Sequence, residues 1–288
     1  MIRAITTALA AVTMLGPGLS ILPAQVAVDS ANRYANVGVI MVWRVDSAGN
    51  PVELRGFASG TLIGDRVIVT AGHFTAPATT LGALPPWIRI VASFSPSDAR
   101  NPQTWIPVVS QATHPSMPRC PPPPQCDPTD EILVAPLEPG IADVGLVFLG
   151  TAPPGVQPAR LAAPGTLDRR EGAPTIIVGY GITAPGRRGP PVDTAIWDGK
   201  RRIRTSALRR VVDETWALWS IPSYVCHGDS GGGIFLASGA TGRGAVLVAN
   251  VSDGGLDCRR HNNNNRLDTQ SVQAWIEATV RQQMSTTR

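Results

Sequence analysis

A serine set among glycines stands out in the second half of the sequence. Residues 226–233 read Cys-His-Gly-Asp-Ser-Gly-Gly-Gly, with Ser230 near the middle. Glycines at 228 and 231 allow backbone N–H groups to lie close to the serine oxygen. A serine nucleophile needs a base to take its proton and donors to stabilise the oxyanion formed on an attacked carbonyl. The stretch therefore suits acyl transfer at Ser230, although the same residue types also form ordinary turns.

A histidine in the first half of the chain could act as the base. His73 follows the stretch Val-Ile-Val-Thr-Ala-Gly, at the end of a predicted strand, and the small residues before it leave the imidazole room to face a cleft. Histidine is also the side chain that titrates nearest neutral pH, which suits proton transfer. Because most histidines after a strand are structural, His73 is a candidate only in combination with other residues.

An aspartate stands at the start of an apolar stretch. Residues 141–149 read Ile-Ala-Asp-Val-Gly-Leu-Val-Phe-Leu, so Asp143 is the one charged group among them. A carboxylate is not left unpaired in such a place. Asp143 therefore either caps local backbone or accepts a hydrogen bond from an imidazole, and the residues alone leave both alternatives open.

Composition and patterning predict that strands hold these residues. The 29 glycines and 27 prolines divide the chain into short segments rich in Val and Ile, a pattern typical of β structure. Strands are expected at 37–43, 56–63, 65–73, 87–94, 105–111, 141–149, 174–181, 215–221 and 244–252. One helix is expected at the end of the chain, with Thr269 as its N-cap and Val272, Trp275, Ile276, Ala278 and Thr279 on its packing face.

The N-terminal residues indicate export. Arg3 precedes a run of apolar and small residues that Pro17 and Gly18 interrupt, and Ala24 and Ala27 follow as cleavage points. This pattern is typical of a signal peptide, assigned to residues 1–27 with an approximate cut, and the run is too interrupted for a good membrane span. The mature protein is expected to be soluble, monomeric, free of the membrane, and extracellular or periplasmic.

The positive charge is concentrated in one arginine-rich stretch. The net charge of +4 comes almost entirely from arginine, because Lys200 is the only lysine. Arg201, Arg202 and Arg204, with Arg209 and Arg210 further along, could indicate a nucleic-acid or acidic partner. No aromatic platform or nucleic-acid motif accompanies them. The prediction is a solvated hairpin and no nucleic-acid binding.

Two of the four cysteines flank a run of prolines. Cys120 and Cys126 are separated by Pro-Pro-Pro-Pro-Gln, and in an exported protein this spacing indicates a local disulfide in a surface insertion. The spacing does not favour a metal or redox site, since no second cysteine pair of that type is present. No metal and no cofactor are expected.

Taken together, these stretches resemble the trypsin-like (chymotrypsin-fold) serine endopeptidases. The resemblance is carried by Thr70-Ala71-Gly72-His73, by Asp143-Val144-Gly145-Leu146 and by Gly228-Asp229-Ser230-Gly231-Gly232, in that order. Val178-Gly179-Tyr180-Gly181 resembles the strand that opens the second barrel of the family, and Asn250-Val251-Ser252-Asp253-Gly254 resembles its substrate-pairing strand. Cys226 and Cys258 have the spacing of the disulfide that walls the family's specificity pocket. The resemblance covers roughly residues 35–283.

The resemblance implies a fold and a set of roles. The fold would be all-β, with two six-stranded antiparallel β-barrels and a C-terminal α-helix, residues 28–158 forming the first barrel unit and residues 159–288 the second barrel and the helix. Ser230 would be the nucleophile, His73 the general base and acid, and Asp143 the group that orients the imidazole, with backbone N–H groups of Gly228 and Ser230 as the oxyanion hole. Tyr224, Ser252, Asp253 and Gly254 would bind substrate, partly by strand pairing. The resemblance also implies a peptide or protein substrate, and it allows a protein inhibitor as a further partner.

The sequence departs from the family pattern at several positions. Gly72 replaces the usual alanine, Phe74 the cysteine that often follows the histidine, and Gly233 the usual proline. Tyr224 stands at the position of the pocket floor, where aspartate would select basic side chains. In the family, the freed N-terminus of an Ile-Val-Gly-Gly-like segment that follows an Arg or Lys pairs with the aspartate matched by Asp229. This sequence contains no such segment, so the resemblance leaves open which group pairs with Asp229.

Two other function classes are compatible with parts of the sequence. Gly228-Asp229-Ser230-Gly231-Gly232 also satisfies the Gly-x-Ser-x-Gly nucleophile elbow of α/β-hydrolases, which would make the protein an esterase. That fold needs an aspartate and a histidine after the serine, and the short remainder of the chain offers only His261 in an Asn-rich segment. A catalytically silent, protease-like binding module is the second alternative.

Overall fold

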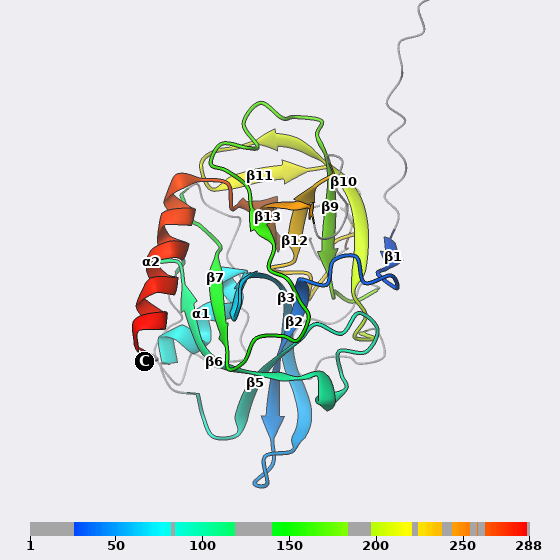
Figure 1. Ribbon diagram of the computed structural model, residues 1–288, viewed down its shortest axis with the longest axis vertical. Helices are drawn as coiled ribbons and strands as arrows, with labels where there is room; N and C mark the ends of the chain where they lie inside the picture. The colour runs from blue at the N-terminus through cyan, green and yellow to red at the C-terminus, as the bar shows by residue number, and fades with distance from the viewer. Residues whose placement is uncertain are drawn as a thin grey trace, which may run out of the picture.

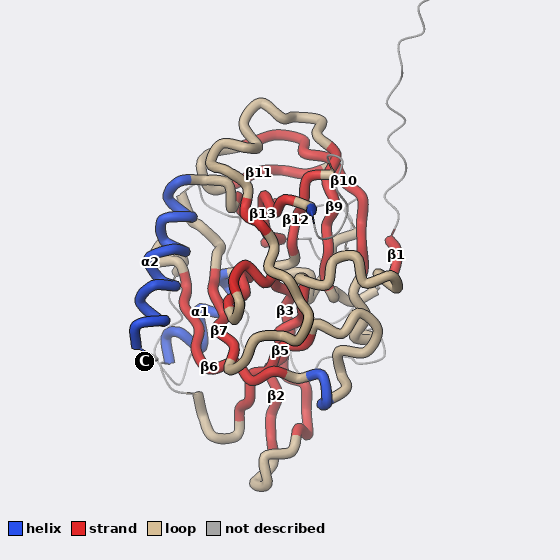
Figure 2. The backbone as a smooth tube through the Cα atoms, in the orientation of Figure 1, coloured by secondary structure: helices blue, strands red, loops and turns tan. Residues whose placement is uncertain are grey.

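The computed structural model describes residues 26–81, 84–118, 140–183, 197–220, 224–237, 244–253, 258 and 263–286 of the chain. Within these residues strands dominate, and the two α-helices lie near one another at one side of the molecule (Figure 2). The predicted signal peptide and the Cys120 and Cys126 pair lie outside the described residues, apart from the short strand β1 (Val26–Val28), which contains the predicted cut.

The first barrel consists of six strands in the described part of the chain, and each strand pairs antiparallel with the next until the ring closes. In Figure 1 it forms the lower half of the molecule. Its strands, in spatial order, are β2 (Val37–Val45), β3 (Pro51–Gly64), β4 (Val67–Thr70), β7 (Gly145–Leu149), β6 (Ile106–Thr113) and β5 (Ile88–Ser93). A short 3₁₀ turn, Pro102–Thr104, precedes β6.

Strand β2 shows why these residues form a barrel wall. Successive side chains of a strand point to opposite faces, and in β2 both faces are apolar. Ile40 and Val42 pack in a cluster confined to the first barrel, whereas Val37, Val39 and Met41 pack in a cluster that reaches the second barrel. The seam between the barrels is therefore an apolar core in its own right.

The second barrel closes in the same way, again with six antiparallel strands in the described residues. Its strands, in spatial order, are β9 (Pro174–Gly179), β10 (Arg202–Val211), β11 (Trp216–Trp219), β14 (Asn263–Arg266), β13 (Val246–Asp253) and β12 (Gly233–Leu236). Two short strands attach to this ring: β1 pairs antiparallel with β10, and β8 (Arg160–Leu161) pairs parallel with β13. The predicted two-barrel architecture is confirmed, and the α/β-hydrolase alternative, which requires a mainly parallel sheet, is excluded.

The C-terminal helix α2 (Gln270–Thr286) lies along the side of the molecule beside β6 and β7 (Figure 1). Val272 and Ile276 are buried as predicted, and the ring of Trp275 packs edge-on against His114 at 5.0 Å between centroids. Ala278 is exposed instead of packed. Thr269 directly precedes the helix, but in the described structure its hydroxyl has no hydrogen-bond partner, so its side chain does not cap the helix.

Two elements near the functional residues differ from the sequence prediction. Residues 72–81 form a helix, α1 (Gly72–Leu81), and not the end of a strand. Gly72 and Pro77 are both helix-breaking signals, but Thr75 and Thr79 hydrogen-bond to the Thr113 hydroxyl of β6 at 2.7 and 3.0 Å. These tertiary contacts hold the helix against the first barrel.

The prediction of a solvated arginine hairpin is also wrong. Residues 202–211 form the strand β10, and Arg201, Arg202 and Arg204 are buried, with exposed fractions of 0%, 8% and 1%. Only Arg209 and Arg210 face solvent. A buried arginine requires a counter-charge, and the partner of Arg204 proves to be Asp229, beside Ser230.

Candidate active site

His73 and Asp143 are joined by two hydrogen bonds. The imidazole Nδ1 lies 2.8 Å from Oδ2 of Asp143, and the backbone N–H of His73 donates to Oδ1 at 2.7 Å. His73 is the second residue of α1, so its N–H has no partner within the helix. Asp143 therefore caps a helix and accepts a hydrogen bond from an imidazole. Of the two alternatives that the sequence left open, the bond to an imidazole is the one that occurs, and the backbone that Asp143 caps is not local but belongs to His73.

The glycine before the histidine allows this close approach. A Cβ at Gly72 would lie 2.9 Å from the backbone nitrogen of Val144 and 3.0 Å from its oxygen. Any side chain there would push the Asp143–Val144 backbone away from α1. Glycine at this position thus permits the close approach of α1 to the Asp143–Val144 backbone.

The second barrel supplies further polar contacts to Asp143. The Ser252 hydroxyl donates to Oδ2, and Oδ1 of Asn265 accepts the backbone N–H of Asp143 at 2.9 Å. The Asn250 side chain donates to the Asp143 carbonyl at 3.2 Å. All three side chains are buried and come from β13 and β14. The aspartate of the first barrel is therefore held in place by the second.

These contacts determine the charge of Asp143 and the tautomer of His73. Burial alone raises the pKa of Asp143, but the charge and hydrogen bonds of His73 and the Ser252 hydroxyl hold this pKa below its ordinary value of 3.8. The carboxylate is thus ionised at neutral pH and can only accept hydrogen bonds. Nδ1 of a neutral His73 must then carry the proton, which leaves Nε2 with a lone pair and able to act as a base.

Ser230 follows a tight turn whose backbone is anchored to the first barrel. The Asp229 N–H donates to the Cys226 carbonyl at 2.9 Å, and the Gly232 N–H donates to the Asp229 carbonyl at 2.7 Å. Ser59 of β3 holds the turn at two points: its N–H donates to the Ser230 carbonyl at 2.8 Å and its hydroxyl to the Gly228 carbonyl at 2.7 Å. We call residues 226–232 the serine loop.

The same contacts connect the serine loop with His73 and Asp143. Thr70, three residues before His73, donates its hydroxyl to the Ser59 carbonyl at 2.7 Å. On the other side, the Gly231 N–H donates to the carbonyl of Val251 at 2.7 Å, next to Ser252. Ser230, His73 and Asp143 are thus brought to one seam between the barrels by residues that immediately adjoin them.

Two backbone N–H groups of the serine loop remain available to a ligand. Within the described residues, the N–H groups of Gly228 and Ser230 donate to no protein acceptor. Gly228 has φ +88°, and a Cβ on it would lie 2.0 Å from the Phe57 ring. Only glycine fits this position. Backbone donors near a serine oxygen are suited to the charge that develops on an attacked carbonyl.

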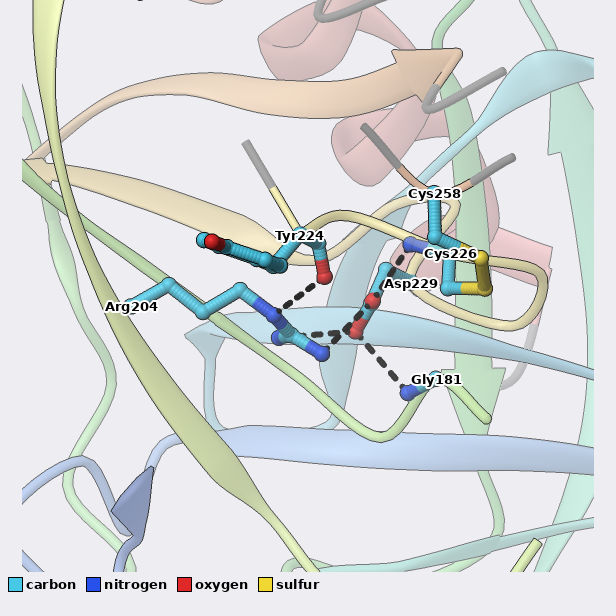
Figure 3. Close-up of a disulfide and its surroundings, with 6 residues drawn as sticks. All are labelled: Gly181, Arg204, Tyr224, Cys226, Asp229 and Cys258. Atoms are coloured by element: carbon cyan, nitrogen blue, oxygen red, sulfur yellow. Dashed lines mark hydrogen bonds and ion pairs between the residues drawn. A yellow bond between two sulfur atoms is a disulfide. The ribbon is translucent and has the colours of Figure 1, made fainter. Parts of the chain in front are cut away.

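Asp229 points away from these donors into the second barrel. Its carboxylate is completely buried and forms an ion pair with Arg204 of β10, with Nη2 and Oδ2 2.9 Å apart. It also accepts the backbone N–H groups of Gly181 at 2.8 Å and Cys226 at 2.9 Å (Figure 3). Cys226 forms the predicted disulfide with Cys258.

Comparison with known proteins gives structural matches only. No protein-family model and no curated protein matches the sequence. Among solved structures, granzyme C is similar with a TM-score of 0.52 and 15% identity over 87% of this chain and 95% of the other. Neuropsin, a serine protease expressed in the limbic system of mouse brain, is similar with a TM-score of 0.50 and 18% identity over 84% and 93%.

The chain has the trypsin-like serine protease fold. This trypsin-like fold accounts for the order of the two barrels and for the seam at which the candidate residues meet. At such low identity the comparison extends no further than the fold, so the roles of individual residues depend on the geometry described above.

Sequence reasoning missed several residues of this trypsin-like seam. Ser59, Asn264, Asn265 and Arg204 all hold the serine loop or the Asp143 network, with the Asn264 side-chain oxygen accepting the Ser252 N–H at 3.3 Å. Ser59 offers a signal, since it is a polar residue in a stretch predicted as strand. Arg204 lies in the arginine-rich stretch predicted as a solvated hairpin, and the run of asparagines resembles a loop.

The predicted substrate-binding residues are only partly described. Ser252 is buried against Asp143, and Asp253 is half-buried at the end of β13. Tyr224 has φ +52°, and its carbonyl accepts a hydrogen bond from Nε of Arg204 at 2.8 Å. Gly254 lies outside the described residues. No group of three His, Cys, Asp or Glu side chains that could hold a metal ion occurs in the part of the chain that is described.

Proposed function

We propose that the protein is a secreted serine endopeptidase that hydrolyses peptide bonds through an acyl-enzyme on Ser230. The observation that carries the proposal is the double hydrogen bond between His73 and the fully buried Asp143. It fixes the imidazole so that Nε2 is the basic nitrogen. The available N–H groups of Gly228 and Ser230 support the same reaction.

The first half of the reaction forms an ester. The Ser230 oxygen attacks the peptide carbonyl while Nε2 of His73 takes the hydroxyl proton, and the carbonyl oxygen becomes an oxyanion that the Gly228 and Ser230 N–H groups stabilise. The tetrahedral intermediate then collapses and the C–N bond breaks. His73 returns its proton to the leaving amine.

The second half uses water in the same way. His73 removes a proton from a water molecule, which attacks the acyl carbon, and the proton returns to the Ser230 oxygen as the ester bond breaks. Asp143 remains ionised and stabilises the imidazolium in both halves, which agrees with the lowered pKa of its carboxyl group.

The substrate in this proposal is an extended peptide. Its backbone would pair with residues 252–254, of which Ser252 and Asp253 end β13, a mode of recognition that reads the main chain. Tyr224 is neutral, and burying a substrate cation beside it would lack a counter-charge. We therefore propose a preference for small or medium apolar residues before the scissile bond.

Export from the cell is part of the proposal. The Cys226–Cys258 disulfide is typical of an oxidising compartment. No helix in the described part of the chain is both long and apolar enough to span a membrane. The signal-like pattern of residues 1–27 remains a prediction, which N-terminal sequencing of the secreted protein tests.

Substitution of the three residues tests the catalytic proposal. Ser230→Ala and His73→Ala should each lower kcat on a peptide substrate by about four to six orders of magnitude, with Asp143→Asn costing somewhat less. Circular dichroism should show an unchanged fold for Ser230→Ala. Near-normal peptidase activity in Ser230→Ala would refute the assignment, and absence of hydrolysis by the folded wild type on a broad peptide library would favour the silent binding module.

The same library tests the specificity proposal. Cleavage sites located by mass spectrometry should follow small or medium apolar residues. A strong preference for Arg or Lys before the cut would show that Tyr224 does not act as proposed.

A further inference from the structure

Asp229 is a buried carboxylate directly beside the nucleophile, and it needs a positively charged partner. Its side chain has an exposed fraction of 0%, and it is the residue that precedes Ser230. A buried carboxylate without a partner is strongly unfavourable and would turn toward water. Such a movement would carry along the peptide unit between Asp229 and Ser230, which includes the Ser230 N–H. The placement of the oxyanion donors thus depends on a cation that keeps Asp229 buried.

Arg204 supplies this cation from near the start of β10. Its Nη1 lies 3.1 Å from Oδ1 and its Nη2 2.9 Å from Oδ2 of Asp229, so that the guanidinium contacts both carboxylate oxygens. The side chain of Arg204 is itself 1% exposed. Two-point contact between a planar guanidinium and a carboxylate restricts direction as well as distance.

The surroundings of Asp229 are shaped for this pair. A Cβ at Gly179 would lie 2.3 Å from Oδ1, and a Cβ at Gly181 would lie 2.2 Å from Oδ2. These two glycines therefore leave room for the carboxylate, while the Gly181 and Cys226 N–H groups donate to it (Figure 3). Each carboxylate oxygen therefore accepts one backbone N–H group, and Arg204 adds the positive charge that these neutral donors do not supply.

The N-terminal strand β1 lies beside β10, but the ion-pair partner of Asp229 is Arg204 and not a residue of β1. Strand β1 pairs with β10 so that Val26 lies opposite Arg204 and Val28 opposite Arg202, with all three β1 side chains exposed. The segment is anchored just after β1, where the buried Asp29 pairs with the buried Arg201 at 3.0 Å. The chain thus runs along the surface of the second barrel while Arg204 occupies the position beside Asp229.

We propose that Arg204 is the positioning residue of the serine loop and makes the protease active without proteolytic release of a new N-terminus. In the family that the sequence resembles, a freed N-terminal ammonium group pairs with the matching aspartate. Here a side chain of the same chain provides the positive charge as soon as the second barrel folds. This inference rests on the proposed peptidase function and concerns its regulation.

The same guanidinium also connects two parts of the site. Nε of Arg204 donates to the Tyr224 carbonyl at 2.8 Å, and Tyr224 has a strained backbone with φ +52°. Tyr224 is the predicted floor of the specificity pocket. Arg204 therefore fixes the pocket floor and the oxyanion donors together, and its removal should affect both kcat and KM.

Substitutions at Arg204 give the first test. Arg204→Ala should lower kcat/KM by at least about 100-fold, the loss expected when an oxyanion donor is misplaced, while the thermal midpoint still shows a folded protein. Arg204→Lys keeps the charge but loses the two-point contact, and its activity should lie between those of Arg204→Ala and wild type. Arg202→Ala is the matched control, because Arg202 is buried on the same strand and pairs with Asp198, away from the serine loop. It should leave kcat and KM unchanged.

A second test does not depend on the folding of a variant. A short uncleavable tag is inserted between Ala27 and Val28, after the predicted signal peptide, and the purified protein, with the tag shown to be present by mass spectrometry, is compared with the untagged protein. Equal kcat/KM is expected, since no free N-terminus is needed. Activity that appears only after the tag has been removed would overturn the proposal, as would full activity in folded Arg204→Ala.

The outcomes separate the two proposals. If the wild type hydrolyses peptides but Arg204→Ala is equally active, only the role of Arg204 fails. If the folded wild type neither hydrolyses peptides nor reacts with a fluorophosphonate, the peptidase proposal itself fails, and with it the inference about regulation.

Discussion

The backbone N–H of Asp143 donates to the side-chain oxygen of Asn265 at 2.9 Å, across the boundary between the two barrels. Both residues have exposed fractions of 0%. The amide group of Asn265 is held in turn, because its nitrogen donates to the Arg266 carbonyl at 3.0 Å. The direction of the Asp143 carboxylate, and through it that of the His73 ring, therefore depends on a side chain of the second barrel.

Removing the Asn265 side chain should impair catalysis more than binding. Asn265→Ala leaves the buried Asp143 N–H without an acceptor, and small displacements of a catalytic group can cost up to about 100-fold in rate. We expect kcat to fall by about 10-fold or more and KM to change little. Asn263→Ala, on the same strand but half-buried, should leave both constants unchanged. Equal kinetic constants for Asn265→Ala and Asn263→Ala would contradict a positioning role.

A side chain at Gly228 should be poorly tolerated. Gly228→Ala places a methyl group 2.0 Å from the Phe57 ring at a residue with φ +88°, so we expect overpacking of about 1–3 kcal/mol in addition to about 1 kcal/mol of backbone strain. Gly155 is the control, because it has φ +70° but open space around its Cβ position. Urea denaturation should show that Gly155→Ala loses only the strain contribution. Similar losses in the two variants would show that the Phe57 contact is unimportant.

The disulfide at the serine loop should contribute measurably to stability. The Cys226–Cys258 bond closes a loop with a sequence separation of 32 residues, for which the chain-entropy treatment gives about 3–4 kcal/mol. We expect the Cys226→Ala/Cys258→Ala variant to lose this amount in the free energy of unfolding. Peptide mapping without reductant should find this pair and the predicted Cys120–Cys126 pair. A link between Cys120 and Cys226 would refute the pairing.

Acid should destabilise the hairpin between β10 and β11. Partial burial raises the pKa of Asp213, but hydrogen bonds from the Thr215 hydroxyl and the N–H groups of Thr215 and Trp216 outweigh it and lower the pKa below 3.8. A carboxyl group with a lowered pKa stabilises the fold above its ordinary pKa, and this stabilisation is lost as the pH falls through the lowered value. Asp213→Asn should therefore lower the thermal midpoint at pH 7 by a few degrees, about 1 kcal/mol.

The decisive observation is how the difference in thermal midpoint between wild type and Asp213→Asn changes with pH. This difference in thermal midpoint should decrease steadily below pH 3.8, where the wild-type carboxyl group becomes protonated and loses its charge. Glu214→Gln, at the exposed neighbouring position, should track wild type throughout. A gap between wild type and Asp213→Asn that stays constant from pH 7 to pH 2 would contradict the assignment.

Much of the fold could be predicted because its signals are local. The Val- and Ile-rich stretches of β2, β4 and β9 read as strands without further information. The two-barrel architecture was implied by the resemblance of the stretches around His73, Asp143 and Ser230 to trypsin-like endopeptidases. The helix α1 could not be predicted, since its stability comes from hydroxyl contacts to Thr113 and not from its own sequence.

The buried polar network was beyond sequence reasoning for a different reason. Arg204 lies in a stretch where arginines are frequent, and its burial depends on Asp229, which is distant in the sequence. Asn265 likewise reads as part of a polar loop until Asp143 is placed beside it. In both cases the partner decides the role of the residue, and only the closed barrels bring the partners together.

The reactivity of Ser230 is the central claim, and a fluorophosphonate tests it most directly. Such a reagent phosphonylates a serine only when a base and oxyanion donors activate it. The folded protein should gain one adduct, which peptide mapping places on Ser230, and Ser230→Ala and the urea-unfolded protein should gain none. A folded wild-type protein that stays unlabelled, or that carries the adduct on another serine, would contradict the account.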